Sequence, residues 1–491
     1  MTGAAEAPAG SGRGRLISAV MLGVASGAIL VPLNSTMLAV ALPGVMDEFG
    51  LPASTVTSLV SLYLGAVAIA LPVGGALGDR FGSRRVFLVG VLGFGAASLV
   101  AALASSFVVL EVARVLQAAS GALVSTSSAT LIRETAPPDR RGETFGLFDL
   151  LTSTSAAVGP FIGGLIVGAF GWRAMFFLAT PIAIGAAIVV GLVLNRPGRR
   201  AGDPPARPHA PLDVAGLGLL GLTIAAFLVA LRGSDAGIFG TVAAIAVIPL
   251  LGVFLVVELR QPRPAVDPHL FRRRSFAAAI IGIFGATVVL HGSFILVPLL
   301  VERLLHESPA TSGIVLLGIA GVGAIVAPFG GRASDRIGRR RLVVAGSLVT
   351  AVGLAALALP AGVSSSIVVA VLLGVVGLGL GLAGSPRQVA AFEAIEPGRM
   401  GMAAGTYYTG RYLGGVVGAS LAGAVLGVSV TTGGVSIGFG LLAVAALIVA
   451  VVSLWLPGRP HGLPAPGADF APSPATEGDF ATPPLREAGP T

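Results

Sequence analysis

The chain has 491 residues, of which 54% are hydrophobic and only 11% are charged, and its mean hydropathy is +0.92. A soluble protein of this length needs far more charge to cover its surface, so the composition excludes a soluble globular protein. The net charge of +8 comes from 31 basic residues, every one an arginine, and the chain has no cysteine, which excludes disulfides and thiolate metal sites.

Apolar stretches long enough to cross a bilayer recur from one end of the chain to the other. The sequence therefore predicts an all-α polytopic membrane protein with fourteen transmembrane helices. The first apolar run is too long for the core of a signal peptide, so we expect it to be retained as the first span. The predicted spans are residues 16–42, 56–77, 86–105, 107–132, 144–170, 174–195, 212–231, 236–258, 275–301, 309–331, 342–360, 364–386, 402–428 and 433–456.

The loops between these spans carry arginine mainly on one side. One series of alternate loops holds most of the arginines, whereas the opposite series holds Arg173, Arg232 and Arg303. The positive-inside rule puts the arginine-rich series and both termini in the cytoplasm, with the chain crossing the plasma (inner) membrane many times. The positive charge therefore reflects topology, and we expect no nucleic-acid partner.

A charged loop occurs twice, at matching places in two hydrophobic halves. The stretch that begins at Gly75 and contains Asp79 recurs 256 residues later (79 to 335), around Asp335. Glycines let such a loop turn sharply, and its acid and arginines can form ion pairs that break easily. Four glycines of span five also recur in span thirteen, 259 residues later (142 to 401). Duplication of this kind predicts two equivalent bundles that move against each other.

The repeat divides the chain into two pseudo-symmetric six-helix bundles with two inserted helices between them. Two bundles joined by a linker suit a rocking motion about a central cavity. We expect the Pro-, Gly- and Ala-rich ends to be disordered. The predicted regions are a disordered N-terminus at 1–15, a bundle at 16–195, a cytoplasmic linker at 196–211, the inserted helices and their loop at 212–274, a second bundle at 275–456 and a disordered tail at 457–491.

In these motifs the chain resembles the major facilitator superfamily, and specifically its fourteen-helix drug:proton antiporter branch. The repeated loop is similar to the signature loop between helices two and three, which in that family latches the cytoplasmic side of one bundle to the other. The resemblance implies that Asp79 and Asp335 each face a helix N-terminus, where a carboxylate is favoured by about 0.3–1 kcal/mol. The alternative is that the loop charges only set topology. The implied gate residues are Gly75, Asp79, Arg80, Gly82, Arg84, Arg85, Gly331, Asp335, Arg336, Gly338 and Arg340.

Span four carries a buried arginine in the sequence Arg114-Val-Leu-Gln117, which resembles the intramembrane arginine motif of the family, although Ala118 stands where Gly is usual. An arginine within the bilayer costs about 2.5–3.5 kcal/mol on insertion scales, so it needs a partner. Glu111 lies three residues earlier and can pair with Arg114 along one helix face. The resemblance implies a role in proton transfer, and a purely structural ion pair is the alternative.

Span five resembles the antiporter motif of the family at Gly159, Pro160, Gly163 and Gly164. Proline permits a kink, and glycines let a neighbouring helix pack closely. The resemblance implies a tight seam that resists proton leakage and favours export, whereas ordinary helix packing is the alternative.

The resemblance also identifies candidates for the substrate cavity. The branch commonly carries an acid in span one before an Ala-Leu-Pro sequence, but here Asn34 takes that place. Asn34 can hydrogen-bond a substrate but cannot carry a proton. Gln117, Tyr408 and Arg411 are further cavity candidates, and Arg411 could contact an anionic or polar substrate or a structural partner.

Three side chains besides Arg114 are candidates for proton coupling. Asp149 shares a helix face with Pro160 and should point inward, although it lies close to the start of its span and could be an interfacial charge. His291 can titrate near neutrality, or be a neutral histidine with its hydrogen bonds satisfied. Glu111 is the third, although Arg114 would hold it ionised.

These observations predict a secondary active transporter that exports small amphipathic compounds, drug-like or endogenous, by alternating access and proton antiport. A lipid or metabolite carrier, working by uniport or symport, is the alternative within transport, and a transport-inactive sensor or scaffold is the alternative from another class. The sequence has no phosphate-binding Gly-Lys-Ser/Thr loop and no cluster of metal ligands. We therefore expect no enzyme activity, cofactor or metal, and a functional monomer whose partners are the substrate, protons and the lipid bilayer.

Overall fold

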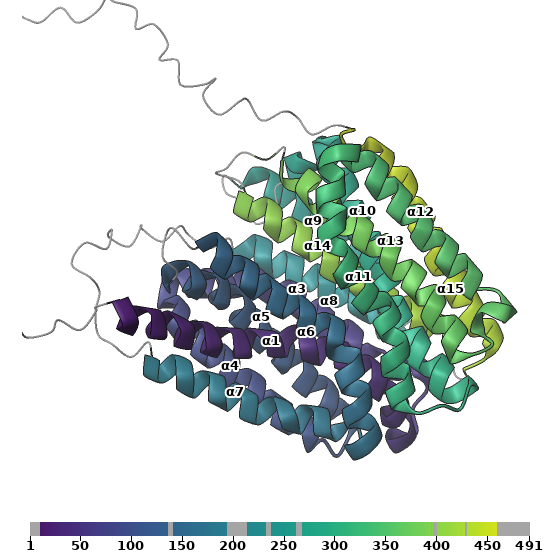
Figure 1. Ribbon diagram of the computed structural model, residues 1–491, viewed down its shortest axis with the longest axis horizontal. Coiled ribbons are helices and arrows are strands. Elements are labelled where there is room, and N and C mark those ends of the chain that lie inside the picture. The colour runs from purple at the N-terminus through teal and green to yellow at the C-terminus, as the bar shows by residue number, and fades with distance from the viewer. Residues whose placement is uncertain are drawn as a thin grey trace, which may run out of the picture.

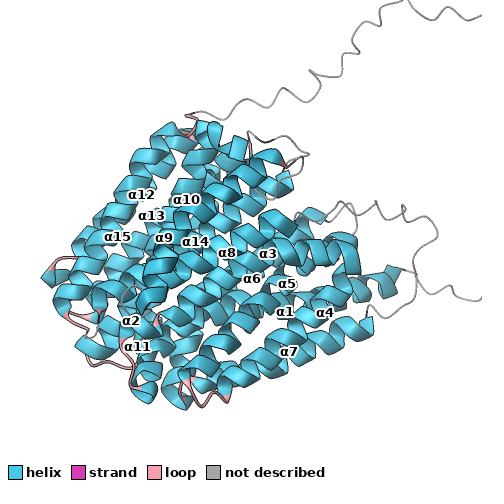
Figure 2. Cartoon of the chain, turned by 180° about the vertical axis from the view of Figure 1, so that it is seen from behind, coloured by secondary structure: helices cyan, strands magenta, loops and turns pink. Residues whose placement is uncertain are grey.

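The computed structural model describes residues 10–135, 141–193, 214–231, 237–261, 268–393, 395, 400–427 and 430–458. Within these ranges all regular secondary structure is helical, as Figure 2 shows, which confirms the predicted all-α fold. The predicted linker at 196–211 and the tail from residue 459 onward lie outside the described residues, as do residues 1–9.

The first half of the chain forms one bundle. Its helices are α1 (Gly10–Phe49), the short α2 (Ala53–Val56), α3 (Ser58–Phe81), α4 (Ser83–Ala102), α5 (Phe107–Thr135), α6 (Arg141–Phe170) and α7 (Arg173–Val193). These helices match the first six predicted spans to within a few residues at most ends. The exceptions are the two ends of α1, which begins inside the segment predicted as disordered and continues past the predicted end at residue 42.

The second half forms the other bundle (Figure 1). It contains the 3₁₀ turn η3 (Pro268–Arg272), α10 (Arg274–Leu299), the π-helical turn η4 (Leu300–Leu304), α11 (Pro309–Ile337), α12 (Arg339–Leu357), the 3₁₀ turn η5 (Pro360–Val363), α13 (Ser366–Phe392), α14 (Met400–Leu426), α15 (Thr432–Val452) and the 3₁₀ turn η7 (Ser453–Trp455). The inserted helices are α8 (Val214–Leu231) and α9 (Gly237–Arg260). Among the described helices, 12 are long and apolar enough to cross a membrane, and α8 and α14 account for the other two predicted spans.

Large apolar side chains cover the outside of these helices, and glycines allow close contact inside. On α9, Phe239 is 74% exposed and Ile248 is 78% exposed, as expected for a helix that faces lipid. A Cβ placed on Gly346 of α12 would lie 2.6 Å from the backbone oxygen of Gly379 of α13. Such close backbone approach replaces the hydrophobic effect as the force that associates helices in lipid. The inserted helix α8 packs on α3, where a Cβ on Gly65 would meet Leu228.

The repeated loops have the same backbone geometry in the two halves. Gly82 ends α3 with φ +87°, and Gly338 ends α11 with φ +95°. In each case the glycine N–H donates to the carbonyl four residues earlier, at 2.9 Å to Gly78 and 3.0 Å to Ser334. Only glycine adopts this conformation without strain, which explains why both copies of the loop carry it. We call the end of the molecule that contains these loops the motif end, and the opposite end the far end.

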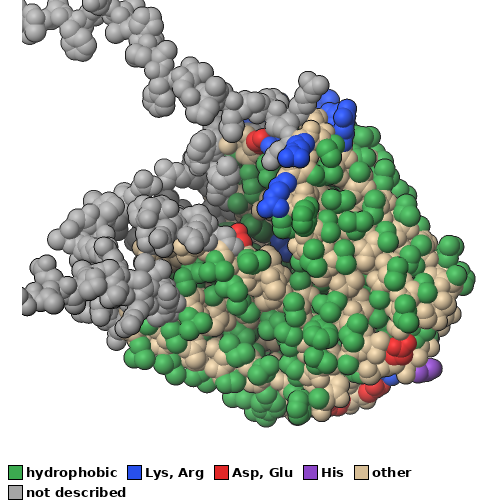
Figure 3. Space-filling view, viewed as in Figure 1, with side chains coloured by type: hydrophobic (Ala, Val, Ile, Leu, Met, Phe, Trp, Pro, Cys, Tyr) green, Lys and Arg blue, Asp and Glu red, His purple; other side chains and the backbone are tan. Residues whose placement is uncertain are grey.

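The two bundles are in contact at the far end and separate toward the motif end. Figure 1 shows the N-terminal and C-terminal halves diverging in the direction of the start of α1. The space-filling view shows the surface hollowed between the halves on that side, with basic side chains along the rim (Figure 3). We call this space the central hollow. Its position between two equivalent bundles makes it the first place to look for a functional site.

Candidate functional site

An ion pair joins the two bundles at the far end. The guanidinium of Arg303, in the π-helical turn η4, donates to Asp47 Oδ1 at 2.5 Å and to the Pro43 carbonyl at 2.8 Å, both on α1. π-helical turns are rare and occur often at functional sites. Nearby, Arg173 of α7 pairs with Glu48 of α1, which also accepts from Trp172 Nε1 at 2.8 Å. The first pair crosses between bundles, whereas the second stays within one.

Helices α6 and α11 form the closest contact between the bundles. A Cβ on Gly164 would lie 2.5 Å from the Pro309 carbonyl, and a Cβ on Gly313 would lie 2.6 Å from the Pro160 carbonyl. On the adjacent face of α6, a Cβ on Gly163 would lie 3.1 Å from Met37 Cα of α1, and Gly159 lies against Thr36. The predicted antiporter motif therefore holds α6 tightly against a helix of its own bundle and against one of the other bundle.

A second seam joins α3 and α14. The hydroxyls of Ser61 and Ser420 are hydrogen-bonded at 2.9 Å across it. A Cβ on Gly415 would lie 2.9 Å from Leu64, and Gly423 lies against Thr57. The seam is therefore closed near the far end by side chains of the N-terminal bundle that pack directly against glycines of α14.

The gate residues at the motif end make contacts within their own bundles. Arg84 donates to the Gly191 carbonyl of α7 at 3.0 Å, and Arg340 donates to the Leu456 carbonyl at 2.8 Å. Asp79 and Arg80 are exposed, as is Arg336. Of the remaining gate residues, Gly82 and Gly338 form the helix-ending turns described above, Gly75 and Gly331 lie near the ends of α3 and α11, Arg85 is exposed in α4, and the side chain of Asp335 lies outside the description.

The intramembrane arginine has amide partners in place of the carboxylate that the sequence predicted. Arg114 Nη1 donates to Asn34 Oδ1 at 2.6 Å and to Gln117 Oε1, and Gln117 in turn donates to Ser98 at 2.6 Å. Glu111 accepts instead from Ser58 of α3, at 2.5 Å. The guanidinium is fully buried, and its Nε and Nη2 atoms have no hydrogen-bond partner. The Arg114 charge is thus solvated by two amides and an aromatic ring, because the Tyr63 ring centre lies 4.1 Å from Arg114 Cζ.

We predict that Asn34→Asp raises the unfolding free energy by about 1.5–3 kcal/mol, the usual contribution of a hydrogen bond to a charged group. A carboxylate at this position would neutralise the buried guanidinium of Arg114, and thermal unfolding of the purified protein would measure the gain. The control is the same change in an Arg114→Gln background, where the aspartate has no cation to pair with and should be destabilising. If Asn34→Asp destabilised the protein equally with Arg114 and with Gln at that position, the interpretation that Arg114 is a buried charge without a counter-ion would be wrong.

The proton-coupling candidates lie in different surroundings. Asp149 is exposed on α6, and in steps of three, four or seven residues its face continues through Ser153 and Pro160 to Gly164, which contacts α11. Asp149 therefore lies on the helix face that, farther along α6, contacts the opposite bundle, and the inward orientation of its side chain stays a prediction. His291 is enclosed within the C-terminal half, where Nδ1 lies 3.2 Å from the Thr287 carbonyl. A Cβ on Gly415 would come within 3.0 Å of the same ring nitrogen.

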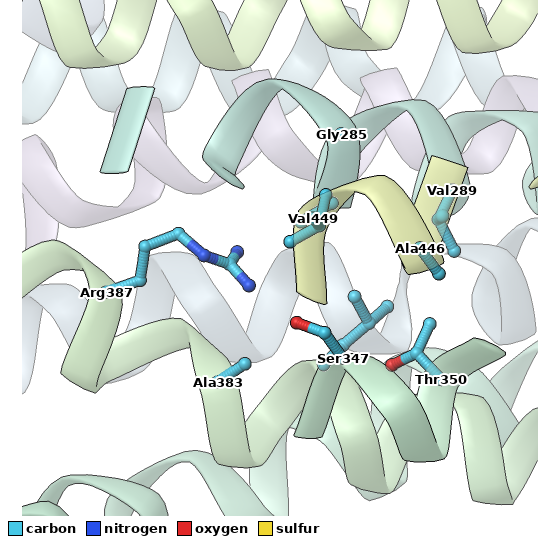
Figure 4. Close-up of a pocket in the computed structure, with 10 residues that line it drawn as sticks. Gly285, Val289, Ser347, Thr350, Ala383, Arg387, Ala446 and Val449 are labelled. Carbon is cyan, nitrogen blue, oxygen red and sulfur yellow. The ribbon is translucent and has the colours of Figure 1, made fainter. Parts of the chain in front are cut away.

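A second buried arginine lies in the C-terminal bundle, and sequence reasoning assigned it no role. Arg387 of α13 is 2% exposed, and its Nε atom has no hydrogen-bond partner. Figure 4 shows its side chain extending toward a small pocket between α10, α12, α13 and α15, beside Val449 and the hydroxyls of Ser347 and Thr350. Arg339 of α12 is also buried and pairs with Glu393, so among the described residues the N-terminal bundle carries one buried arginine and the C-terminal bundle two.

Comparison with known proteins agrees with this architecture. The model of the Major Facilitator Superfamily matches residues 24–419. The chain belongs to this superfamily. The Tetracenomycin C resistance and export protein of Streptomyces glaucescens is 32% identical over 87% of this chain and 78% of its own length. The Multidrug resistance protein B homolog of Mycobacterium tuberculosis (strain ATCC 25618 / H37Rv) is 29% identical over 81% of this chain and 74% of its own length.

Solved structures show the same superfamily fold. A peptide transporter POT in complex with sulfate superposes with a TM-score of 0.68 at 18% identity, covering 89% of this chain and 94% of its own. A POT family transporter in complex with 5-aminolevulinic acid superposes with a TM-score of 0.66 at 17% identity, covering 90% of this chain and 95% of its own. The superfamily match and the long apolar helices identify the chain as a multi-pass membrane transporter of the Major Facilitator Superfamily.

Sequence reasoning missed the ion pair between Asp47 and Arg303. A signal for it was present, because the two residues are 256 positions apart, the same offset that relates the repeated loops. Residues at equivalent positions of a two-fold repeat can meet at the symmetry axis. Opposite charges at equivalent ends of the first spans of the two bundles therefore indicate a contact between them.

Proposed function

We propose that the protein is a secondary active exporter of small amphipathic compounds that works by alternating access and proton antiport. The observation that carries the proposal is the pair of bundles sealed against each other at one end, with a hollow between them that opens at the other. Such an arrangement supports a rocking exchange between two open states. Relatives named as export and multidrug resistance proteins support the outward direction.

The proposal takes the motif end as cytoplasmic, because the arginine-rich loops lie there. In this orientation the structure is an inward-open state, ready to accept a substrate from the cytoplasm or the inner leaflet. The far-end seams and the pair between Asp47 and Arg303 then form the outer gate. In the opposite state these contacts would break, and the exposed charges at Asp79 and Arg80 would close the inner side by pairing across the bundles.

The proposed function is tested by uptake into proteoliposomes that contain the purified full-length chain. The probes are three pyrene compounds of similar size and different charge, namely pyrenebutyrate, pyrenebutanol and pyrenebutylamine. We expect an imposed pH gradient to accelerate the movement of at least one probe above protein-free liposomes. Identical movement of all three probes with and without protein and gradient would contradict a proton-coupled exporter of amphipathic compounds.

Asp149 is the proposed proton carrier, because its side chain is exposed and lies on the face of α6 that contacts α11 farther along the helix. We predict that Asp149→Asn lowers substrate-induced proton flux to the level of protein-free liposomes, since the amide cannot bind and release a proton. A pH-sensitive dye trapped inside the vesicles measures the flux, and Asp149→Glu, which keeps the carboxyl group, should retain part of it. Unaltered flux through Asp149→Asn would move the role to His291 or Glu111.

A further inference from the structure

One face of α14 passes from the seam between the bundles into the central hollow. Near the far end, Gly415 and Gly423 on this face contact Leu64 and Thr57 of the N-terminal bundle. Arg411 and Tyr408 lie four and seven residues before Gly415, so the three residues share one face of α14. Both are exposed, Tyr408 by 38%, because the bundles have separated at this level. Their side chains border the central hollow.

The charge of Arg411 is not compensated by the residues around it. Among the described residues, Arg411 makes no hydrogen bond or ion pair. The charged or titratable side chains nearest to it are His291, Tyr407 and Tyr412, and Tyr407 also lies within electrostatic range of the buried Arg387. Neither α10 nor α14 contains an aspartate or glutamate. The C-terminal wall of the central hollow is therefore cationic.

Tyrosines gather near this cation on α14. The chain has only 4 tyrosines, and Tyr407, Tyr408 and Tyr412 stand within two turns of α14. The Tyr407 and Tyr408 rings meet edge to face with centres 6.0 Å apart, and Phe392 extends the group at 5.4 Å from Tyr407. Aromatic surface with one fixed charge binds a ligand that has a flat apolar body and a single polar group.

We propose that Arg411 and Tyr408 bind an aromatic anion, so that the substrate is an amphipathic compound with a carboxylate or phenolate. The inference rests on the proposed export function and names its substrate class. An accessible guanidinium that lacks a counter-ion among the described residues attracts an anion and repels an organic cation. Asn34 occupies the position in span one where the resemblance leads us to expect an acid that could bind cations. Asn34 instead accepts a hydrogen bond from Arg114. The proposed proton carrier, Asp149, lies on a different helix, α6, which packs on α11, so it remains available for the proton.

The test measures binding of the three pyrene probes to the full-length protein in lipid nanodiscs, by probe fluorescence anisotropy. We expect pyrenebutyrate to bind at least about tenfold more tightly than pyrenebutanol, equivalent to about 1.4 kcal/mol, and pyrenebutylamine to bind most weakly. Arg411→Gln should reduce the affinity for pyrenebutyrate to that for pyrenebutanol, and Arg411→Lys should retain a preference for the anion. The matched control is Arg272→Gln, which removes an exposed arginine of η3 and should change nothing.

Two outcomes would overturn the anion site, namely tighter binding of pyrenebutylamine than of pyrenebutyrate, or undiminished binding of pyrenebutyrate to a monodisperse Arg411→Gln variant. The uptake assay separates this failure from failure of the export function. Gradient-driven uptake of pyrenebutylamine in place of pyrenebutyrate would refute the anion site and leave the exporter standing. Arg411-dependent binding of pyrenebutyrate, without gradient-driven uptake of any probe, would support the site and refute the exporter.

Discussion

Cross-linking of an Asp47→Cys, Arg303→Cys double variant with a short bismaleimide is expected to reduce transport to the level of protein-free liposomes. The two side chains meet at 2.5 Å across the far end, so a covalent link there prevents the bundles from separating. Transport by alternating access requires that separation, because the substrate must leave on the side that is closed in this structure. The chain has no cysteine of its own, so the reagent reacts only at the introduced positions.

A second double variant supplies the control for this experiment. Glu48→Cys with Arg173→Cys replaces an ion pair at the same end of the molecule, but both residues belong to the N-terminal bundle. A link within one rigid bundle should leave most of the transport activity, and each single Cys variant should tolerate the reagent. Full transport by the cross-linked Asp47→Cys, Arg303→Cys protein would rule out the far end as a moving gate.

Gly164→Ala is expected to make the protein leak protons and to lower transport by about tenfold. The new Cβ would lie 2.5 Å from the Pro309 carbonyl and 3.2 Å from the Ala310 and Gly313 α-carbons, all of them backbone atoms that cannot rotate away. Overpacking of this kind costs about 1–3 kcal/mol. A destabilisation of the closed far end by about 1.4 kcal/mol changes the equilibrium between its closed and open states tenfold. The seam between α6 and α11 would then stay partly open at the far end.

Gly168→Ala provides a matched comparison on the same helix. A Cβ there would lie 3.8 Å from the nearest atom outside its own helix, the Ala310 nitrogen, which is ordinary van der Waals contact. We therefore expect this variant to transport and to hold a pH gradient as the wild type does. The decay of a gradient across proteoliposomes, followed with an internal pH dye, measures the leak. If Gly164→Ala and Gly168→Ala held the gradient equally well, the tight seam would not be the proton seal.

The membrane fold could be predicted closely because its constraints are local. A bilayer requires long apolar helices, so for α3 to α15 hydropathy predicts most of the helix ends to within a few residues. The repeat could be read in the same way, since Gly82 and Gly338 are needed for identical turns that no other residue makes easily. Helical periodicity alone places Asp149 on the face of α6 that also carries Pro160.

Pairing between helices could not be predicted in the same way. Glu111 and Arg114 lie on one helix face three residues apart, yet each bonds to another helix, Glu111 to Ser58 and Arg114 to Asn34. Periodicity describes only the helix's own surface, whereas a buried arginine takes whichever acceptors the neighbouring helices bring to it. The role of Arg411 was left open for the same reason, because the presence or absence of a partner depends on helices distant in the sequence.

The amino-acid sequence by itself determined the spans, the duplication, the two glycine turns and the series of loops in which arginine gathers. All of these depend on the free-energy cost of exposing backbone and charge to lipid, and each segment must avoid that cost by itself. Only the tertiary structure decided that the far end is sealed by Asp47 and Arg303, that Gly164 contacts the backbone of α11, and that Arg411 is exposed, with no ion pair among the described residues. These features depend on how two bundles meet, and small residues permit many such contacts until the packing of the whole molecule selects one.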